Sequence, residues 1–275
     1  MLGAIIGDYV GSRFEFSPHK SVDFPLVTEQ SHWTDDTVHT VALAEHLLTG
    51  APYAALLKRY FRDFPDAGYG GRFTVWAASD DLTPYNSFGN GSAMRVSPVG
   101  WFFADLETVL LEAEKSAAVT HDHPEGIRGA QAVAGAVWMA RQGADKMEIR
   151  TFIADRFGYD LDRPLEAIRP GYRFDVTCQG SVPEAIICFL EATSYENSIR
   201  NAVSLGGDAD TQACIAGSIA EAYYRNIPSV LLKTVRGSLP GPFVDVINAF
   251  HRIKMSGENG FPNDEKGFES TERIW

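Results

Sequence analysis

Residues 31–50, "SHWTDDTVHTVALAEHLLTG", join a polar segment to an apolar one. Within residues 35–49, apolar side chains recur at the i, i+3, i+7 spacing of one helix face, and the glycine that follows is typical of a helix end. The stretch therefore predicts a helix that begins with two adjacent aspartates, Asp35 and Asp36. A capping role accounts for one aspartate at a helix start, but a second carboxylate beside it adds repulsion. The second aspartate needs another explanation.

The same helical periodicity continues along the rest of the chain. Alternating apolar and polar patterns, which indicate strands, are almost absent, and no repeat or linker-like break divides the sequence. We therefore expect one all-α domain over 1–275, with residues 256–275 loosely ordered. One further helix would start with a capping box at Ser181 and Glu184. The remaining predicted helices cover 52–64, 105–118, 124–142, 196–205, 210–225 and 241–254.

Composition limits the classes of partner. The 275 residues are 45% hydrophobic, enough for a sizeable core, and the formal net charge is −12. This charge disfavours binding to nucleic acid or to an anionic membrane surface. An anionic substrate would need a local source of positive potential, such as metal ions or oriented backbone amides.

The cysteines and the apolar segments indicate a cytoplasmic protein. Three cysteines without C-x-x-C spacing are best explained as buried, reduced thiols. The N-terminal stretch lacks the basic region of a signal peptide. The longest apolar stretch elsewhere, 129–140, is shorter than the ~20 residues that span a bilayer. We expect no membrane partner.

A second pair of carboxylates precedes another predicted helix, in "SLGGDADTQACIAGS" (204–218). Asp208 and Asp210 are two residues apart, so in extended backbone they point to the same side. A helix cap is an equally good explanation of either loop alone. Taken together, the two loops offer four carboxylates and two threonine hydroxyls, oxygen ligands that suit Mg²⁺ or Mn²⁺ better than zinc. A pair of divalent ions would make the adjacent carboxylates tolerable.

Two further loops carry candidate ligand-binding residues. In 84–100, the backbone N–H groups of residues 89–92 (Gly89, Asn90, Gly91 and Ser92) can form a nest for phosphate, although a plain tight turn is the commoner explanation. Arg95 is either a phosphate ligand or part of a structural salt bridge. In 119–126, His121 or His123 could be a general acid or base, a metal ligand or a phosphate contact. A capping role is an alternative, mainly for His123. We interpret the seven-residue spacing of His32, His39 and His46 as coincidence or one helix face.

Five stretches of the sequence resemble the signature motifs of the ADP-ribosylglycohydrolase family, which includes the enzyme that reactivates ADP-ribosylated dinitrogenase reductase. The matching motifs occur in the expected order between residue 3 and about 225. They are "GAIIGDYVGSRFE" (3–15), "TDDT" (34–37), "FGNGSAMRVSPVG" (88–100), "THDHPEG" (120–126) and "GGDADT" (206–211).

The resemblance implies a fold and a set of site residues. The fold would be an orthogonal all-α bundle that holds two Mg²⁺ or Mn²⁺ ions between loops at helix starts. Glu15 would lie near the scissile bond, with Glu15 or Asp36 acting on the proton. Metal ligands would be Thr34, Asp35, Asp36, Asp208, Asp210 and Thr211. Substrate-binding residues would be Gly70 and Gly71 beside the distal ribose, Ser87, Phe88, Gly89, Asn90 and Gly91 around the diphosphate, and His121.

The function implied is hydrolysis of the glycosidic bond at C1″ of ADP-ribose, through an oxocarbenium-like state that a nearby carboxylate stabilises. The substrate would be an ADP-ribosylated protein or an ADP-ribose-containing small molecule. Two alternatives remain at this point. One is an ADP-ribose-binding or crystallin-like protein without catalysis, and the other is a dimetal hydrolase of phosphate esters.

Overall fold

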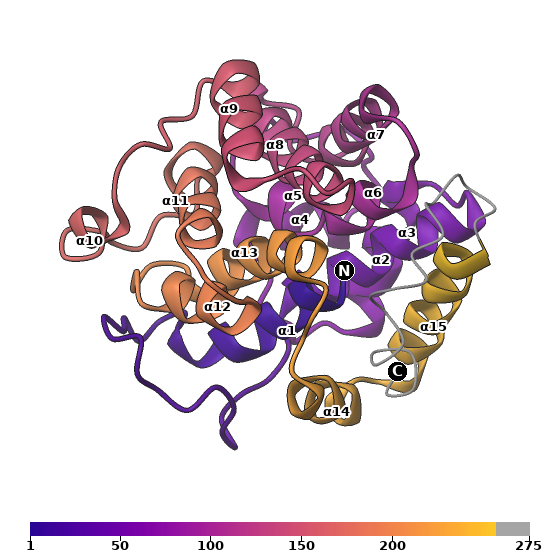
Figure 1. The fold of residues 1–275 in the computed structure, drawn as a ribbon. Coiled ribbons are helices and arrows are strands. Elements are labelled where there is room, and N and C mark those ends of the chain that lie inside the picture. Colours follow the sequence, from indigo (N-terminus) through magenta and orange to yellow (C-terminus); the bar gives the residue numbers. More distant parts are fainter. Residues whose placement is uncertain (257–275) are drawn as a thin grey trace.

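The computed structural model describes residues 1–256, and within them the chain is helical, with one isolated bridge between Gly89 and Thr177 and no strand (Figure 1). The prediction of an all-α fold is confirmed. The elements are α1 (Leu2–Gly11), η1 (Ser12–Phe14), α2 (Asp35–Thr49), α3 (Tyr53–Asp63), α4 (Gly71–Ala78), α5 (Gly91–Met94), α6 (Ser97–Phe102), α7 (Leu106–Ala118), α8 (Pro124–Arg141), α9 (Lys146–Phe157), α10 (Leu165–Ile168), α11 (Cys178–Leu190), α12 (Tyr195–Val203), α13 (Ala209–Tyr224), α14 (Ser229–Ser238) and α15 (Gly241–Ser256).

Most of the predicted helices are confirmed. Helix α2 covers 35–49 as predicted and ends at Gly50, whose φ of 72° is left-handed. The other periodic segments form α3, α7, α8, α12, α13 and α15, with ends within two residues of those predicted. The predicted loose order of 256–275 concerns residues that, from 257 on, lie outside the described part of the chain. No helix in the described part is both long and apolar enough to span a membrane.

The predicted capping box at Ser181 and Glu184 is wrong. Helix α11 already begins at Cys178, where the Thr177 hydroxyl accepts a hydrogen bond from the Gly180 N–H. The Asp175 carboxylate accepts hydrogen bonds from the Thr177 N–H and hydroxyl, which fixes the start of the helix there. The Ser181 hydroxyl instead donates to the Thr177 carbonyl oxygen, 2.7 Å away. A local cap formed by Asp175 and Thr177, rather than the Ser-x-x-Glu spacing, sets where this helix begins.

Helix α1 shows no amphipathic pattern because it is surrounded by protein. All ten of its residues are buried, so no polar face marks its periodicity. Figure 1 shows it beside α13 in the middle of the molecule, with the other helices around the pair. Where every face of a helix is buried, the apolar residues do not repeat at 3.6 residues, and the sequence pattern fails to reveal it.

Helices α1 and α13 touch backbone to backbone. On α1, the glycines Gly3, Gly7 and Gly11 recur every fourth residue and form one stripe. A Cβ on Gly7 would lie 2.1 Å from the carbonyl oxygen of Ala213, and a Cβ on Gly3 would lie 2.3 Å from that of Gly217. No side chain larger than hydrogen fits at these positions. The contact therefore depends on the glycine spacing, and it brings the C-terminal end of α1 to the N-terminal end of α13.

We predict that Gly7→Ala destabilises the protein. The added Cβ clashes with a carbonyl unless α1 moves, and such overpacking costs about 1–3 kcal/mol or more. Alanine's better helix propensity recovers only about 1 kcal/mol. Urea denaturation of the wild type and the variant measures the difference in the free energy of unfolding.

Gly237→Ala in α14 is the matched control, because a Cβ there meets nothing within 4 Å. It should leave the stability unchanged or raise it by up to about 1 kcal/mol. Equal stability of Gly7→Ala and the wild type would contradict the close-contact explanation.

Candidate active site

The first turn of α2 is capped by groups other than its two aspartates. The Thr34 hydroxyl accepts a hydrogen bond from the Asp36 N–H, and the buried Asp8 carboxylate of α1 accepts one from the Thr37 N–H at 3.1 Å. Asp8 also accepts from the Thr34 N–H at 3.0 Å and from the Thr34 hydroxyl at 2.8 Å. A cap therefore does not account for Asp35 or Asp36. Sequence reasoning missed Asp8, whose signal would have been a lone carboxylate inside an apolar helix.

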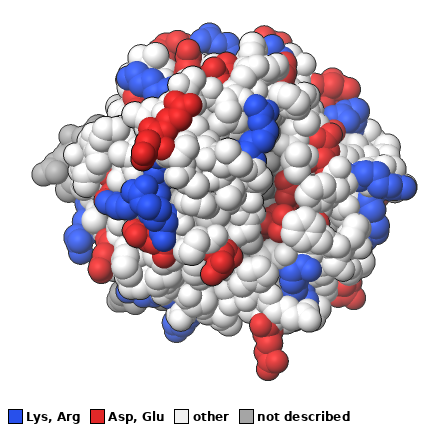
Figure 2. Space-filling model, turned by 180° about the vertical axis from the view of Figure 1, so that it is seen from behind, with Lys and Arg blue, Asp and Glu red and all other residues white. Residues whose placement is uncertain are grey.

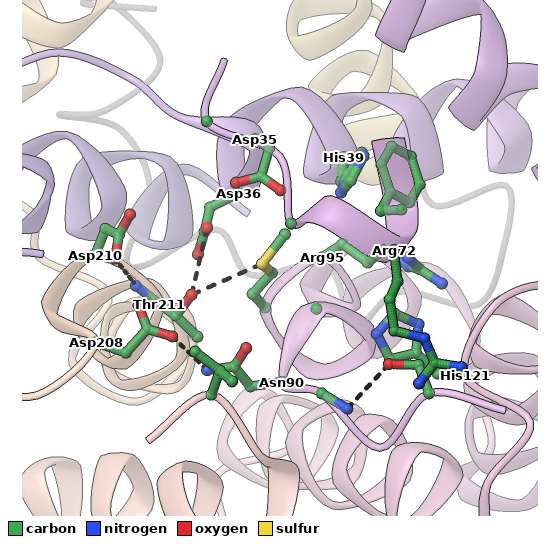
Figure 3. Close-up of a pocket in the computed structure, with 18 of the residues that line it drawn as sticks. Asp35, Asp36, His39, Arg72, Asn90, Arg95, His121, Asp208, Asp210 and Thr211 are labelled. Atoms are coloured by element: carbon green, nitrogen blue, oxygen red, sulfur yellow. Dashed lines mark hydrogen bonds between the residues drawn. The ribbon is translucent and has the colours of Figure 1, made fainter. Parts of the chain in front are cut away.

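The structure brings the two aspartate loops together. The Thr211 hydroxyl lies 3.4 Å from Asp36 Oδ2, which joins the start of α13 to the start of α2 (Figure 3). Glu15, just after η1, has a carboxylate oxygen that lies with oxygens of Asp208 and Asp210 in a group spanning no more than 4.8 Å. Three separate parts of the chain thus place their carboxylates at one end of a cavity of about 300 Å³.

Crowding and burial raise the pKa values of these carboxyl groups. Burial is the main cause for Glu15, whose pKa is raised to about 8, and the charge of Asp210 adds to it. Burial likewise raises the pKa of Asp208 to about 6 and, together with neighbouring carboxylates, the pKa values of Asp35, Asp36 and Asp210 well above their ordinary value. Such an arrangement is stable near neutral pH only with bound protons or bound cations.

The donor set fits a hard divalent cation. Asp36 Oδ1 is buried and has no hydrogen-bond partner, so a charged oxygen here lacks compensation within the protein. The hydrogen bonds that the aspartates do receive come from neutral groups, such as the Asn90 amide on Asp208 Oδ2 at 2.7 Å and the Thr211 N–H on Asp210 at 2.9 Å. Carboxylate and hydroxyl oxygens without nitrogen or sulfur ligands suit Mg²⁺ or Mn²⁺.

The opposite end of the cavity carries nitrogen donors. Figure 3 shows His39, Arg72, Arg95 and His121 on the side away from Asp208 and Asp210. Burial and the charge of Arg95 lower the pKa values of His39 and His121 well below the ordinary value, so both rings are neutral at pH 7. The cavity is thus polarised, with carboxylates at one end and N–H donors at the other.

The glycine-rich loop faces His121. A Cβ on Gly91 would lie 3.2 Å from the imidazole Nε2 of His121, and a Cβ on Gly89 3.5 Å from it. Two of the N–H groups predicted to form a phosphate nest already donate within the protein. The Asn90 N–H donates to the carbonyl of Val176 at 2.8 Å, and the Gly89 N–H donates to the Ser87 hydroxyl at 3.1 Å. A phosphate at this loop would therefore depend more on side chains than the sequence suggested.

Most of the predicted site residues line this cavity. Thr34 and Phe88 do not, since the Thr34 side chain is directed to Asp8 and the Phe88 side chain is 40% exposed with its ring 5.2 Å from that of His123. The residues that line it are Glu15, Asp35, Asp36, Gly70, Gly71, Ser87, Gly89, Asn90, Gly91, His121, Asp208, Asp210 and Thr211.

The structure bears on three single residues for which the sequence left alternatives open. His123 accepts a hydrogen bond from the Glu125 N–H and caps α8, as the capping alternative predicted. Arg95 is fully buried, and its Nη2 donates to the Ser116 carbonyl and the Thr120 hydroxyl rather than to a carboxylate. His39, whose spacing with other histidines was interpreted as uninformative, lines the cavity with both ring nitrogens unpartnered.

The surface gives no competing signal on the side that Figure 2 presents. Lys, Arg, Asp and Glu residues are interspersed there over a largely uncharged surface, without a continuous basic stripe. A basic stripe would be the signature of a nucleic-acid backbone site.

Comparisons with known proteins identify the family of the chain. The family described as ADP-ribosylglycohydrolase matches residues 1–258. The chain is 30% identical to human "ADP-ribosylhydrolase ARH3", covering 82% of this chain and 84% of that protein. It is 26% identical to "ADP-ribosylarginine hydrolase Tri1" of Pseudomonas putida strain GB-1, over 82% of this chain and 69% of that one.

A solved structure confirms the likeness of the fold. The structure titled "ADP-ribosylglycohydrolase-related protein complex" superposes with a TM-score of 0.72 and 28% sequence identity, covering 92% of this chain and 96% of that chain. The family match spans nearly the whole chain. The chain therefore belongs to the ADP-ribosylglycohydrolase family and is an enzyme of that class.

Proposed function

We propose that this enzyme requires Mg²⁺ or Mn²⁺ and hydrolyses the glycosidic bond at C1″ of ADP-ribose, releasing ADP-ribose from a modified protein side chain or small molecule. The observation that carries the proposal is the polarity of the cavity. Its carboxylate end suits cations and ribose hydroxyls, and its nitrogen-bearing end suits an anionic diphosphate. ADP-ribose carries both kinds of group on one molecule.

The metal ligands would come from both aspartate loops. Asp35, Asp36, Asp208, Asp210 and Thr211 line the carboxylate end, and the Thr34 hydroxyl, outside the lining, lies 3.4 Å from Asp36 Oδ2. Two divalent cations bound there would neutralise the carboxylates and attract the ribose hydroxyls. Asn90 would hold Asp208 in position through its 2.7 Å hydrogen bond.

Glu15 is the best placed residue for moving the proton. It is only half-buried, unlike Asp36, Asp208 and Asp210, and it follows η1 at the edge of the carboxylate cluster. In hydrolysis, water adds to C1″, the bond from C1″ to the leaving atom breaks, and the leaving atom takes up a proton. Glu15 can accept the proton of the water or supply that of the leaving group, while the buried aspartates remain ligands.

The chemical identity of the leaving group is a separate question. The names of the two relatives refer to ADP-ribosyl hydrolysis in general and to ADP-ribosylarginine in particular. A product assay with ADP-ribosyl-arginine and ADP-ribosyl-serine peptides, each with Mg²⁺, Mn²⁺ or chelator, tests both the reaction and the substrate. Release of free ADP-ribose only in the presence of metal is the expected result. ADP-ribose binding without any release would favour the non-catalytic alternative.

Glu15→Gln should lower kcat at least tenfold and leave ADP-ribose binding intact. The amide keeps the shape of the side chain but cannot transfer the proton, and a tenfold loss corresponds to ~1.4 kcal/mol of transition-state stabilisation. Initial rates and calorimetric binding on the same preparation separate the two effects. Unchanged turnover would remove Glu15 from the reaction centre.

Asp36→Asn should abolish most of the stabilisation that metal gives. A cation that binds only the folded protein stabilises it by about 2.7 kcal/mol at a hundredfold excess over Kd. The variant loses a ligand and a repelling charge together, so in chelator it should melt no lower than the wild type. Melting curves of both proteins with Mg²⁺, with Mn²⁺ and with chelator measure this. A full metal response in the variant would show that Asp36 is not a ligand.

Metal-free protein should lose stability as the pH rises. The pKa values of Glu15 and Asp208 are raised on folding to about 8 and about 6, so the folded state holds protons that the unfolded chain has released. The stability that these two protonated groups contribute is therefore fully present below their ordinary pKa values and is lost between roughly pH 5 and pH 8. With saturating Mg²⁺ the fall should be smaller or reversed, because protons compete with metal for the carboxylates. Melting temperatures in chelator that rise over this range would contradict the carboxylate cluster.

A further inference from the structure

Arg72 lies between two neighbouring cavities and lines both of them. Together with Gly71 and Tyr85 it lines both the polarised cavity and a neighbouring one of about 520 Å³, whose other walls include Trp76 and Pro84. A ligand anchored at the carboxylate end and longer than a ribose would pass Arg72 before reaching the second cavity. The family motifs found in the sequence do not include this arginine.

The Arg72 side chain is held in place by Tyr85. Its guanidinium carbon lies 5.2 Å from the Tyr85 ring centroid, and one Nη donates to the Tyr85 carbonyl oxygen. The Tyr85 ring in turn lies 6.0 Å from that of His121, which faces Gly91. Arg72, Tyr85, His121 and the glycine-rich loop therefore follow one another along the same wall, and Figure 3 shows Arg72 beside His121.

Other donors converge on this wall. Helix α4 begins at Gly71, and the N–H groups of residues 71–73 precede its first backbone hydrogen bond, from Thr74 to Gly70. Arg95 is fully buried, yet its Nε and Nη1 have no hydrogen-bond partner, and neither ring nitrogen of the buried His39 has one. Buried, unpartnered donors that line a cavity indicate a ligand that accepts hydrogen bonds.

The arginine side chains of the cavity also indicate an anionic ligand. Two arginines line the polarised cavity, and of these Arg95 is buried and Arg72 is exposed. Arg72 is thus the guanidinium that a ligand can contact at the surface of the cavity wall. Its planar fork of N–H donors can bind two oxygens of a phosphate at once.

We propose that Arg72 binds the diphosphate of the substrate and makes the enzyme select a ribose that carries phosphate over one that does not. The inference rests on the proposed function. Because the diphosphate lies away from C1″ and keeps its charge through the reaction, the contact is equally strong in the ground and transition states. Its loss should raise KM and leave kcat nearly unchanged.

The test compares Arg72→Ala and Arg72→Lys with the wild type. Arg62→Ala is the matched control, since it removes the same charge from an exposed position on α3 that lines neither cavity. Calorimetry with Mg²⁺ present measures binding of ADP-ribose, and competition against it measures binding of D-ribose. Arg72→Ala should weaken ADP-ribose binding about ten- to a hundredfold, the usual range for a charged hydrogen bond, and leave D-ribose binding within about twofold.

Two further readouts separate phosphate binding from a general structural role. The salt dependence of ADP-ribose affinity should be shallower in Arg72→Ala than in Arg62→Ala, and Arg72→Lys should recover part of the affinity. If the wild type binds ADP-ribose and Arg72→Ala binds it with the same Kd, the role of Arg72 is overturned and the proposed function still stands. Equal weakening of ADP-ribose and D-ribose would overturn it as well. Failure of the wild type to bind ADP-ribose would overturn both.

Discussion

The backbone contact between α1 and α13 is the constraint on which the site depends. Glycines spaced every four residues on α1 let the carbonyls of α13 approach to distances that exclude any side chain, as at Gly7 and Ala213. The two helices run past each other so closely that η1, which follows α1, lies against the start of α13. Glu15 and Asp210 meet there although nearly two hundred residues separate them in the chain. A bundle with ordinary helix spacing of 8–10 Å would hold these carboxylates further apart.

Asp8 shows how the same contact prepares α2. It projects from α1 and accepts hydrogen bonds from the first turn of α2, with Thr34 as the side-chain cap. Because these two residues cap the helix, the side chains of Asp35 and Asp36 are not needed as caps. One oxygen of Asp36, Oδ1, has no hydrogen-bond partner. A buried charged oxygen that has no partner within the protein is usually compensated by a bound ligand or ion. This is the structural reason for proposing the two aspartates as metal ligands rather than as helix caps.

The sequence predicted the amphipathic helices and the aspartate loops, because periodicity and oxygen ligands leave local signals. It did not predict α1, whose faces are all buried, nor the start of α11, which Asp175 and Thr177 determine through contacts outside the Ser-x-x-Glu spacing. His39 and Arg72 were missed for a related reason. A histidine in a regular helix and an arginine near a glycine pair are common, and only their positions on the cavity wall distinguish them. The convergence of separate loops is a tertiary property that local patterns do not contain.

The polarity of the cavity also explains how an acidic protein can attract an anion. With a net charge of −12, the long-range field opposes a diphosphate, and at physiological salt this field is screened beyond about 8 Å. Within that distance, the electrostatic potential at the ligand is set by the groups that line the cavity. Neutral His121, the amino end of α4 and the guanidinium of Arg72 present donors on one wall, while carboxylates are confined to the other end. Two divalent cations bound by those carboxylates would cancel the charge of the four aspartates at the acidic end. The carboxylates whose repulsion opposes folding would then hold the cations that contact the ribose, and the donors of the opposite wall would be left to bind the diphosphate.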